Sequence, residues 1–329
     1  MKKLFQSFVT DHPMVEDSRE FKFKKQWKNK TYCLGLFLFI VATVIIGSFI
    51  LFIPLSFPIN FLLRTDFMET WRDANPVWAE FLIYGLNLVI GFGGIYLVMA
   101  MFTRYIEKRP FRTLGFVGRK KGIKMLRGFI FGLGSSGLVF LLVLIFTPST
   151  LSTEGHLVAG VAAIPVVLLF MIPWAVQATA EEVVFQGWLV PHLTKRNGVI
   201  IAIIFSAIVF AFIHITNPNM GVLVLINLAL YGVFAALYML YEKSIYGIAT
   251  YHMSWNWSLG QIFGATMFED EQAISIFGLK REGNPILTGG PLGADGSIFE
   301  TVMLILLIGA ILYLQHRRVR SQRNEEKAR

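Results

Sequence analysis

Two adjacent carboxylates, Glu181 and Glu182, stand inside a run of residues that otherwise suits the interior of a membrane. No charged residue occurs between Leu157 and Ala180, and apolar residues follow from Val183 to Phe185. An acidic residue at the centre of a membrane helix costs roughly 2.5–3.5 kcal/mol on insertion scales. We therefore expect the two glutamates to face a water-filled cavity or to have partners inside a helix bundle.

Candidate partners are the few other strongly polar side chains within apolar stretches, which are His214, His252 and Asn256. Residues four apart share one face of a helix, and this spacing recurs in four pairs: Gln177 with Glu181, Glu182 with Gln186, Phe210 with His214, and His252 with Asn256. Adjacent residues point about 100° apart on a helix. One glutamate can therefore face a site while the other is held by a neighbour such as Gln186.

One or two carboxylates, two imidazoles and a carboxamide form a set suited to hydrolysis. A buried glutamate bonded to a histidine can position and deprotonate a water molecule. A second imidazole and an amide N–H can stabilise the oxyanion of a tetrahedral intermediate. The set is complete for peptide-bond cleavage without a covalent nucleophile. Zinc bound by Glu181, His214 and His252 is the alternative, although the chain has no His-Glu-x-x-His motif.

The elements that must position these residues are predicted to be membrane helices. The chain is 55% hydrophobic and only 16% charged, with a mean hydropathy of +0.59, whereas soluble domains carry about 25% charged residues. We expect an all-α polytopic membrane protein, because eight apolar stretches are each near the roughly 20 residues that cross a bilayer. The stretches are Tyr32–Phe57, Val77–Phe102, Gly128–Phe146, Leu157–Leu189, Val199–Ile215, Gly221–Tyr241, Ile245–Phe268 and Ile298–Gln315.

Basic residues predict the topology of these stretches. If the N-terminus is cytoplasmic, 26 of the 30 Lys and Arg residues lie on the inner side, as the positive-inside rule requires. Both termini are then cytoplasmic, and the segments Ser149–Glu154 and Glu269–Ser297 lie outside. The net charge of +9 is explained by anionic membrane lipids, and no nucleic-acid partner is expected.

The chain is expected to have three parts: a basic N-terminal segment at 1–31, a transmembrane domain at 32–315 with a core at about 157–268, and a basic tail at 316–329.

The motifs in the fourth to seventh stretches resemble the CPBP family, which includes type II CAAX prenyl proteases and bacteriocin-processing or immunity proteins. Three motifs carry the resemblance in the family's order: Glu181-Glu182-x-x-Phe185, Phe210-x-x-x-His214 and His252-x-x-x-Asn256. Further features are similar to the prokaryotic branch: Gln177, Gly187, Trp255, Asn256-Trp257 and the segment Arg109-Pro110-Phe111-Arg112.

The resemblance implies a bundle of about eight helices with a polar cavity open toward the cytoplasm, in the plasma membrane of a prokaryote. It implies a glutamate-dependent endopeptidase in which Glu181 and His214 activate water and His252 and Asn256 form the oxyanion site. Glu182, Gln186 and Phe210 would support these residues. No cofactor is favoured, with Zn²⁺ as the minority alternative. The chain departs from the family in having Gln186 where an arginine is usual.

Two other function classes stay open at this point. One is a non-catalytic regulatory or bacteriocin-immunity protein on the same fold, which the change at Gln186 makes conceivable. The other is a transporter, because intramembrane Glu and His also occur in proton relays. The expected partners are membrane lipids and a peptide or protein substrate. The sequence leaves the oligomeric state open.

Overall fold

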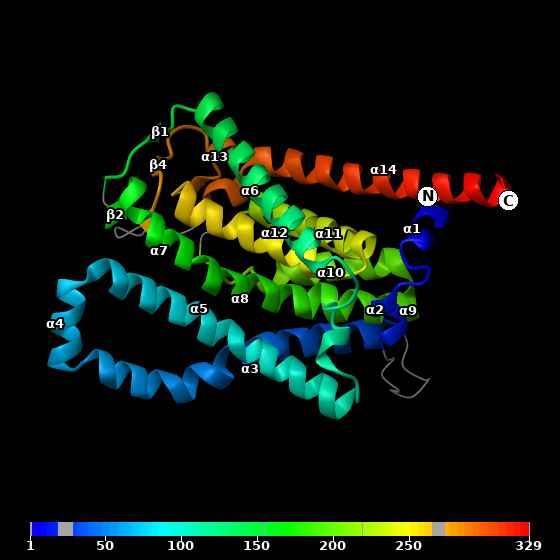
Figure 1. Cartoon of the computed structure of the whole chain (residues 1–329), viewed down its shortest axis with the longest axis horizontal. Coiled ribbons are helices and arrows are strands. Elements are labelled where there is room, and N and C mark those ends of the chain that lie inside the picture. The colour runs from blue at the N-terminus through cyan, green and yellow to red at the C-terminus, as the bar shows by residue number, and fades with distance from the viewer. Residues whose placement is uncertain (1, 19–28, 155, 219, 265–273, 329) are drawn as a thin grey trace.

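The computed structural model describes residues 2–18, 29–154, 156–218, 220–264 and 274–328 of the chain. The described part is dominated by α-helices, which confirms the predicted all-α membrane class. The strands form only two-residue ladders: β1 (Thr150–Leu151) pairs antiparallel with β4 (Leu279–Lys280), and β2 (Val158–Ala159) pairs parallel with β3 (Ile274–Ser275). They tie connecting segments to each other at one end of the bundle (Figure 1).

The predicted apolar stretches are mostly helical where the structure describes them, although the fourth begins with strand β2. Their main helices are α3 (Asn29–Leu63), α5 (Pro76–Met101), α6 (Lys121–Phe146), α8 (Met171–Glu182), α10 (Val199–Ile213), α11 (Val222–Glu242), α12 (Tyr246–Trp257) and α14 (Ile298–Ala328). Within the described ranges, five helices are long and apolar enough to cross a membrane, or six if one bent pair counts as a single span. The predicted count of eight is therefore not confirmed.

Two of the predicted spans are short. Helix α10 has 15 residues, and α12 has 12 before a π-helical segment continues it at Ser258–Ile262. At 1.5 Å per residue, a 15-residue helix covers only about 22 Å of a hydrocarbon layer that is about 30 Å thick. The predicted end of the seventh stretch, at 265–268, lies outside the described residues, as does 269–273 of the outer segment.

The fourth stretch is not one continuous helix. A 3₁₀ turn at Gly160–Ala163 leads into α7 (Ile164–Leu169), which meets α8 at a bend of 45°. Pro173 lies just after the bend and has no N–H to donate to the carbonyl of Leu169, which breaks the regular hydrogen bonding. After α8, the chain forms a π-helix at Val183–Leu189 and then α9 (Val190–Asn197).

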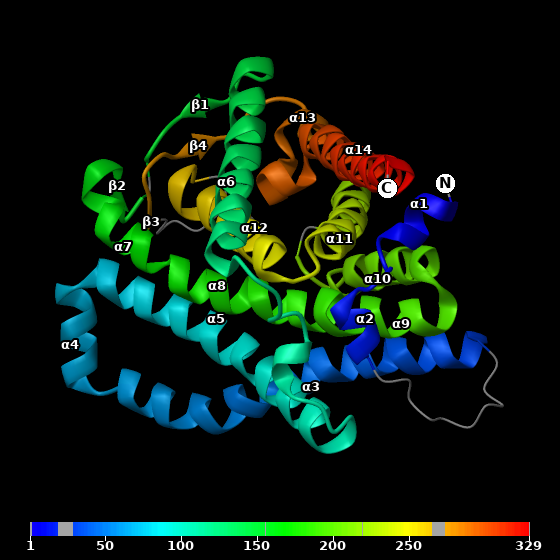
Figure 2. The same ribbon diagram turned by 45° about the vertical axis from the view of Figure 1, so that its right-hand side comes forward.

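Helix α8 occupies the middle of the bundle. It packs against α5 on one side and α12 on the other, while α12 also packs along α6, and α11 packs against α10 and α14 (Figures 1 and 2). The approach of α6 to α12 depends on Gly128, where a Cβ would overlap the carbonyl oxygen of Gly247. The result is a layer of helices on each side of α8, so that its polar residues are enclosed.

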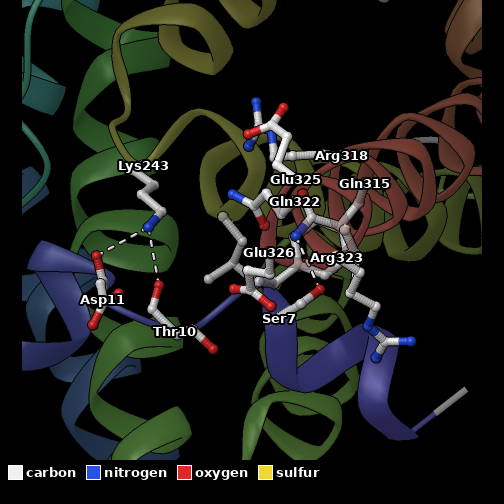
Figure 3. A pocket seen from close by; sticks show the side chains of 13 residues that line it. Ser7, Thr10, Asp11, Lys243, Gln315, Arg318, Gln322, Arg323, Glu325 and Glu326 are labelled. Carbon is white, nitrogen blue, oxygen red and sulfur yellow. Dashed lines mark hydrogen bonds between the residues drawn. The ribbon is translucent and has the colours of Figure 1, made fainter. Parts of the chain in front are cut away.

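The chain termini pack on each other at the end of the bundle opposite the strands. After α1 (Lys2–Ser7) and before α2 (Pro13–Asp17), the carbonyls of Thr10 and Asp11 accept hydrogen bonds from Lys243 at 2.9 and 3.0 Å (Figure 3). A cleft of about 520 Å³ lies between this segment and α14. Helix α14 continues through residues 316–328, so the basic tail extends the last helix.

A short helix, α4 (Asp66–Ala74), joins α3 to α5. The outer segment after β4 forms α13 (Pro285–Thr288) and a 3₁₀ segment at Gly290–Gly296, which returns the chain to the start of α14. Asn227 of α11 holds this return, because its Nδ2 donates to the carbonyls of Asp295 and Ser297, each at 3.0 Å. The outer segment is therefore anchored on the bundle.

Candidate active site

Helix α8 carries both glutamates into the interior. Glu181 is 7% exposed and Glu182 is 1% exposed, and every residue of the following π-helix is buried. Helix α8 is apolar over most of its length and packs between two helices, so its last turn lies away from bulk solvent. Charged groups in such surroundings need hydrogen-bonding partners, and the structure supplies them from other helices.

Glu182 has two partners on one oxygen. The hydroxyl of Tyr231 on α11 donates to Oε1 at 2.8 Å, and Nδ1 of His252 on α12 lies 3.0 Å from the same oxygen. The rings of Tyr231 and His252 also contact each other, with centroids 5.0 Å apart. The other oxygen, Oε2, has no partner among the residues that the structure describes. Glu182 therefore orients the His252 imidazole and is itself held by a tyrosine.

Glu181 is positioned from within its own helix. Nε2 of Gln177, one turn earlier, donates to Glu181 Oε1 at 2.7 Å, and Nδ2 of Asn256 donates to Gln177 Oε1 at 3.0 Å. The second oxygen of Glu181 lies 3.8 Å from Nε2 of His252. That distance exceeds a direct hydrogen bond and leaves this oxygen available. The imidazole of His252 thus lies between the two carboxylates.

His214 lies at the C-terminal end of α10, immediately after Ile213. Its Nδ1 is 2.7 Å from the carbonyl oxygen of Phe210. A carbonyl can only accept, so Nδ1 carries the proton, and in the neutral ring Nε2 has a free lone pair. Phe210 also contacts His214 and Tyr231, with ring centroids 4.8 and 5.5 Å apart. This aromatic contact joins His214 to the cluster, although no hydrogen bond links it to Glu181 in the described part of the chain.

The predicted pairing of Glu182 with Gln186 does not form. Gln186 is fully buried, and neither of its side-chain polar atoms has a hydrogen-bond partner among the described residues. The physical reason is the π-helix that begins at Val183, whose wider turn pairs residues five apart. Residue 186 is therefore displaced from the position directly above residue 182.

The wider turn is associated with Gly187. A Cβ at this position would overlap the carbonyl oxygen of Leu114. The segment before α6 therefore packs directly on the π-helix. Such π-helical turns occur frequently at functional sites.

Three contributors to the site were not among the predicted site residues. Tyr231 is one of three tyrosines in its apolar stretch, and nothing in the sequence distinguishes it from Tyr238 and Tyr241. Gln177 shares a helix face with Glu181, which was the available signal for it. Asp295 approaches from the outer segment: its Oδ1 accepts from Nε1 of Trp255 at 2.9 Å, and it interacts electrostatically with both His214 and His252. No spacing within the sequence could have placed Asp295 there.

The structure thus brings Glu181, Glu182, His252 and Asn256 into one connected network, with His214 beside it. In the described part of the chain, no three His, Cys, Asp or Glu side chains are gathered so that they could hold a metal ion. The alternative in which Glu181, His214 and His252 bind zinc stays a prediction.

Comparison with known proteins adds one match. Residues 162–258 match the family described as Rce1-like, the type II CAAX prenyl endopeptidases. This range contains α8, the π-helix, α10, α11 and α12, and therefore all of the predicted site residues from Glu181 to Asn256. No curated protein and no solved structure matches the chain. The resemblance inferred from the three motifs is confirmed over residues 162–258, which match the Rce1-like family of type II CAAX prenyl endopeptidases.

Proposed function

We propose that the protein is an intramembrane endopeptidase that hydrolyses peptide bonds of membrane-associated peptides or proteins, in processing of the CAAX or the bacteriocin and pheromone type. The observation that carries the proposal is the placement of the His252 imidazole between two buried carboxylates, with Nδ1 at 3.0 Å from Glu182 and Nε2 at 3.8 Å from Glu181. A purely structural network would satisfy all these groups. Here one oxygen of each glutamate accepts no hydrogen bond from the described residues.

Glu181 is the proposed general base. Gln177 occupies its Oε1, which leaves Oε2 to accept a proton from water. The neutral His214 ring can accept a hydrogen bond from the same water at Nε2, because Nδ1–H is fixed on the Phe210 carbonyl. The water oxygen attacks the carbonyl carbon of the scissile bond while its proton passes to Glu181. Positioned general bases of this kind contribute about 10²–10⁴-fold.

His252 and Asn256 are the proposed oxyanion donors. With Nδ1 bonded to Glu182, a protonated His252 still has Nε2–H to donate. Asn256 uses one amide N–H on Gln177 and retains the second. When the tetrahedral intermediate collapses, the C–N bond breaks and the proton on Glu181 passes to the leaving nitrogen. The products are a carboxylate and an amine.

The test compares the peptides of cells that carry the wild type with those of cells that carry Glu181→Gln, by mass spectrometry of tagged peptides. Glu181→Gln keeps the size of the side chain and its bond to Gln177 but cannot take a proton, so cleavage products should disappear. Glu69→Gln, an exposed carboxylate on α4, is the matched control and should leave the products unchanged. Wild-type cleavage rates for purified Glu181→Gln would refute the proposal.

A metal-free mechanism is part of the proposal, and zinc bound by Glu181, His214 and His252 is its alternative. Purified protein that cleaves a substrate should keep its turnover after treatment with a chelator strong enough to remove zinc. Elemental analysis of the same sample should find well below one equivalent of metal. Loss of turnover on chelation with recovery on adding zinc would establish the metalloprotease type instead.

A second candidate is a non-catalytic regulatory or immunity protein, and the environment of Gln186 favours it. The buried amide makes no hydrogen bond in the described structure, and Glu182 Oε2 is likewise without a partner. A family member with arginine there would have a cation in this part of the site. Under the endopeptidase proposal, Gln186→Arg should insert normally and retain or raise turnover. If the wild type cleaves no substrate and the Gln186→Arg variant does cleave one, the result would support the regulatory function.

A further inference from the structure

A second polar cavity, of about 830 Å³, lies away from the glutamates. Its walls are α2, the segment 108–117 that joins α5 to α6, and the end of α9. The charged side chains that line it are Lys108, Arg109, Arg112, Lys195, Glu16 and Asp17. Both carboxylates are on α2 and exposed, and the charged residues of the other walls are all cations.

Arg109 is the buried centre of the cationic wall. It is 5% exposed; its Nε donates to Glu107 Oε2 at 2.7 Å and its Nη1 donates to Thr113 Oγ1 at 3.1 Å. Nη2 is buried and has no partner among the described residues. Leaving such a donor unpaired costs about 1–3 kcal/mol, and more for a charged group. An oxygen acceptor of a ligand would remove that cost.

Two exposed cations stand beside Arg109 without ion-pair partners in the described part of the chain. They are Lys108 and Arg112. Lys108 has a left-handed backbone, with φ at 54°, a conformation that is uncommon for residues other than glycine. The fourth cation, Lys195, donates to the carbonyl of Ser18 at 2.7 Å and so ties α9 to the end of α2. Lys108 and Arg112 therefore remain without an ion pair among the described residues, and Arg109, which is paired with Glu107, contributes its unpartnered Nη2 donor.

We propose that this cavity is a binding site for a phosphate group, held by Arg109 Nη2 with Lys108 and Arg112. Guanidinium groups match the oxygens of phosphate in geometry and charge. The cavity lies where two candidate spans end, Pro76–Ile106 and Lys121–Phe146, which is the level of lipid headgroups. We therefore expect an anionic phospholipid to supply the phosphate group, and soluble phosphate is the alternative ligand.

The cavity is connected to the π-helix after α8 through existing contacts. Glu107, which holds Arg109, also accepts a hydrogen bond at 3.1 Å from Nε1 of Trp188 in the π-helix. Leu114 of the same segment packs on Gly187. A ligand that binds only the folded state stabilises it, so occupancy should raise the melting temperature of the whole protein. This inference does not depend on peptidase activity.

The test uses full-length protein purified in neutral detergent, with Glu181→Gln added so that proteolysis plays no part. Lipid binding is followed by native mass spectrometry and melting temperature, with phosphatidylglycerol, phosphatidylcholine or inorganic phosphate as the probe. We expect tight, saturable binding of one phosphatidylglycerol. Lys108→Gln with Arg112→Gln should weaken it by about fivefold for each cation removed. Arg109 is left intact because its ion pair with Glu107 is structural.

The matched control is Arg119→Gln with Lys120→Gln, which removes two exposed charges that follow segment 108–117 and lie outside the cavity. This variant should bind phosphatidylglycerol like the parent. Equal weakening by both double variants would overturn the proposal, because binding would then depend on diffuse surface charge. Unchanged binding in Lys108→Gln with Arg112→Gln would also overturn it. Saturable protection by inorganic phosphate that this variant loses would support the site and identify a soluble ligand.

Discussion

Helix α3 and the helices around α8 have similarly apolar sequences but place their apolar side chains in different surroundings. In the most apolar part of α3, 22% of the residues are buried, whereas in the most apolar part of α11 the share is 56%. Phe49 of α3 is half exposed, while the charged Glu182 at the end of α8 is 1% exposed. Helix α3 therefore presents its apolar side chains to lipid, and the helices around α8 use theirs to enclose a polar network. Hydropathy alone identifies membrane helices without telling which of these purposes each one serves.

The α3–α5 pair and the helices around α8 also differ in how they are held together. Helices α3 and α5 meet where a Cβ at Gly94 would overlap the carbonyl oxygen of Gly47. Small residues allow such close backbone contact in membranes. Around α8, helices far apart in sequence are joined by hydrogen bonds such as Tyr231 to Glu182. The α3–α5 contact thus depends on close backbone approach, whereas the helices around α8 combine such contacts with polar pairing, and substitutions should separate the two contributions.

The largest effect is expected from His252→Ala. This change removes the imidazole from between the two carboxylates, so we expect turnover to fall by about 10²-fold or more with membrane insertion intact. Phe49→Ala, a truncation on the lipid-facing α3, is the control and should leave turnover within about twofold of the wild type. The comparison would fail if both truncations reduced turnover of a purified substrate to the same degree.

Gly94→Ala should mainly affect stability. Its new methyl group meets the backbone of Gly47, so α3 and α5 must separate, and overpacking of this kind costs about 1–3 kcal/mol. Gly91→Ala, on the same helix, has nothing within 4 Å of its new Cβ and should be neutral or slightly stabilising. Thermal unfolding in detergent measures both. Equal melting temperatures for the two variants would show that the α3–α5 contact does not depend on close approach.

Tyr231→Phe should give a smaller loss confined to the site. It removes only the hydroxyl that donates to Glu182 at 2.8 Å, and a hydrogen bond to a charged group contributes about 1.5–3 kcal/mol. We expect turnover to fall by about tenfold or more, with a loss of stability no larger than that contribution. Tyr313→Phe, on an exposed tyrosine, is the matched control. Full activity in Tyr231→Phe would mean that His252 alone positions Glu182.

The smallest perturbation tests the predicted topology, in which both termini are cytoplasmic. With Cys33 replaced by serine, a cysteine introduced at Thr153 or at Lys280 should react with an impermeant maleimide in intact cells, since both residues are exposed. A cysteine at Asn324, also exposed, should react only after the membrane is permeabilised. Reaction at position 324 in intact cells would contradict the topology. Ser297 is unsuitable for labelling because it is fully buried.

The amino-acid sequence alone determined which side chains must share the interior. Glu181 and His252 stand in apolar stretches where unpaired polar groups are costly, and both are buried in one network. His214 is half-buried at the end of α10, and in the described part of the chain no hydrogen bond joins it to Glu181. The four-residue spacing also placed Gln177 beside Glu181 correctly, because that pair lies within a regular helix. The apolar stretches largely coincide with helices, because membrane helices need long apolar runs, although α6 begins at Lys121, before its predicted start at Gly128, and the fourth stretch is broken.

Only the tertiary structure decided how the interior groups pair. The same four-residue spacing failed for Glu182 and Gln186, because a π-helix begins between them. The partner of Glu182 is instead Tyr231, which is 49 residues away, and Asp295 reaches Trp255 from the outer segment. Periodicity describes neighbours along one regular helix. It cannot report a local change of helical pitch or a contact that exists only because separate helices pack side by side.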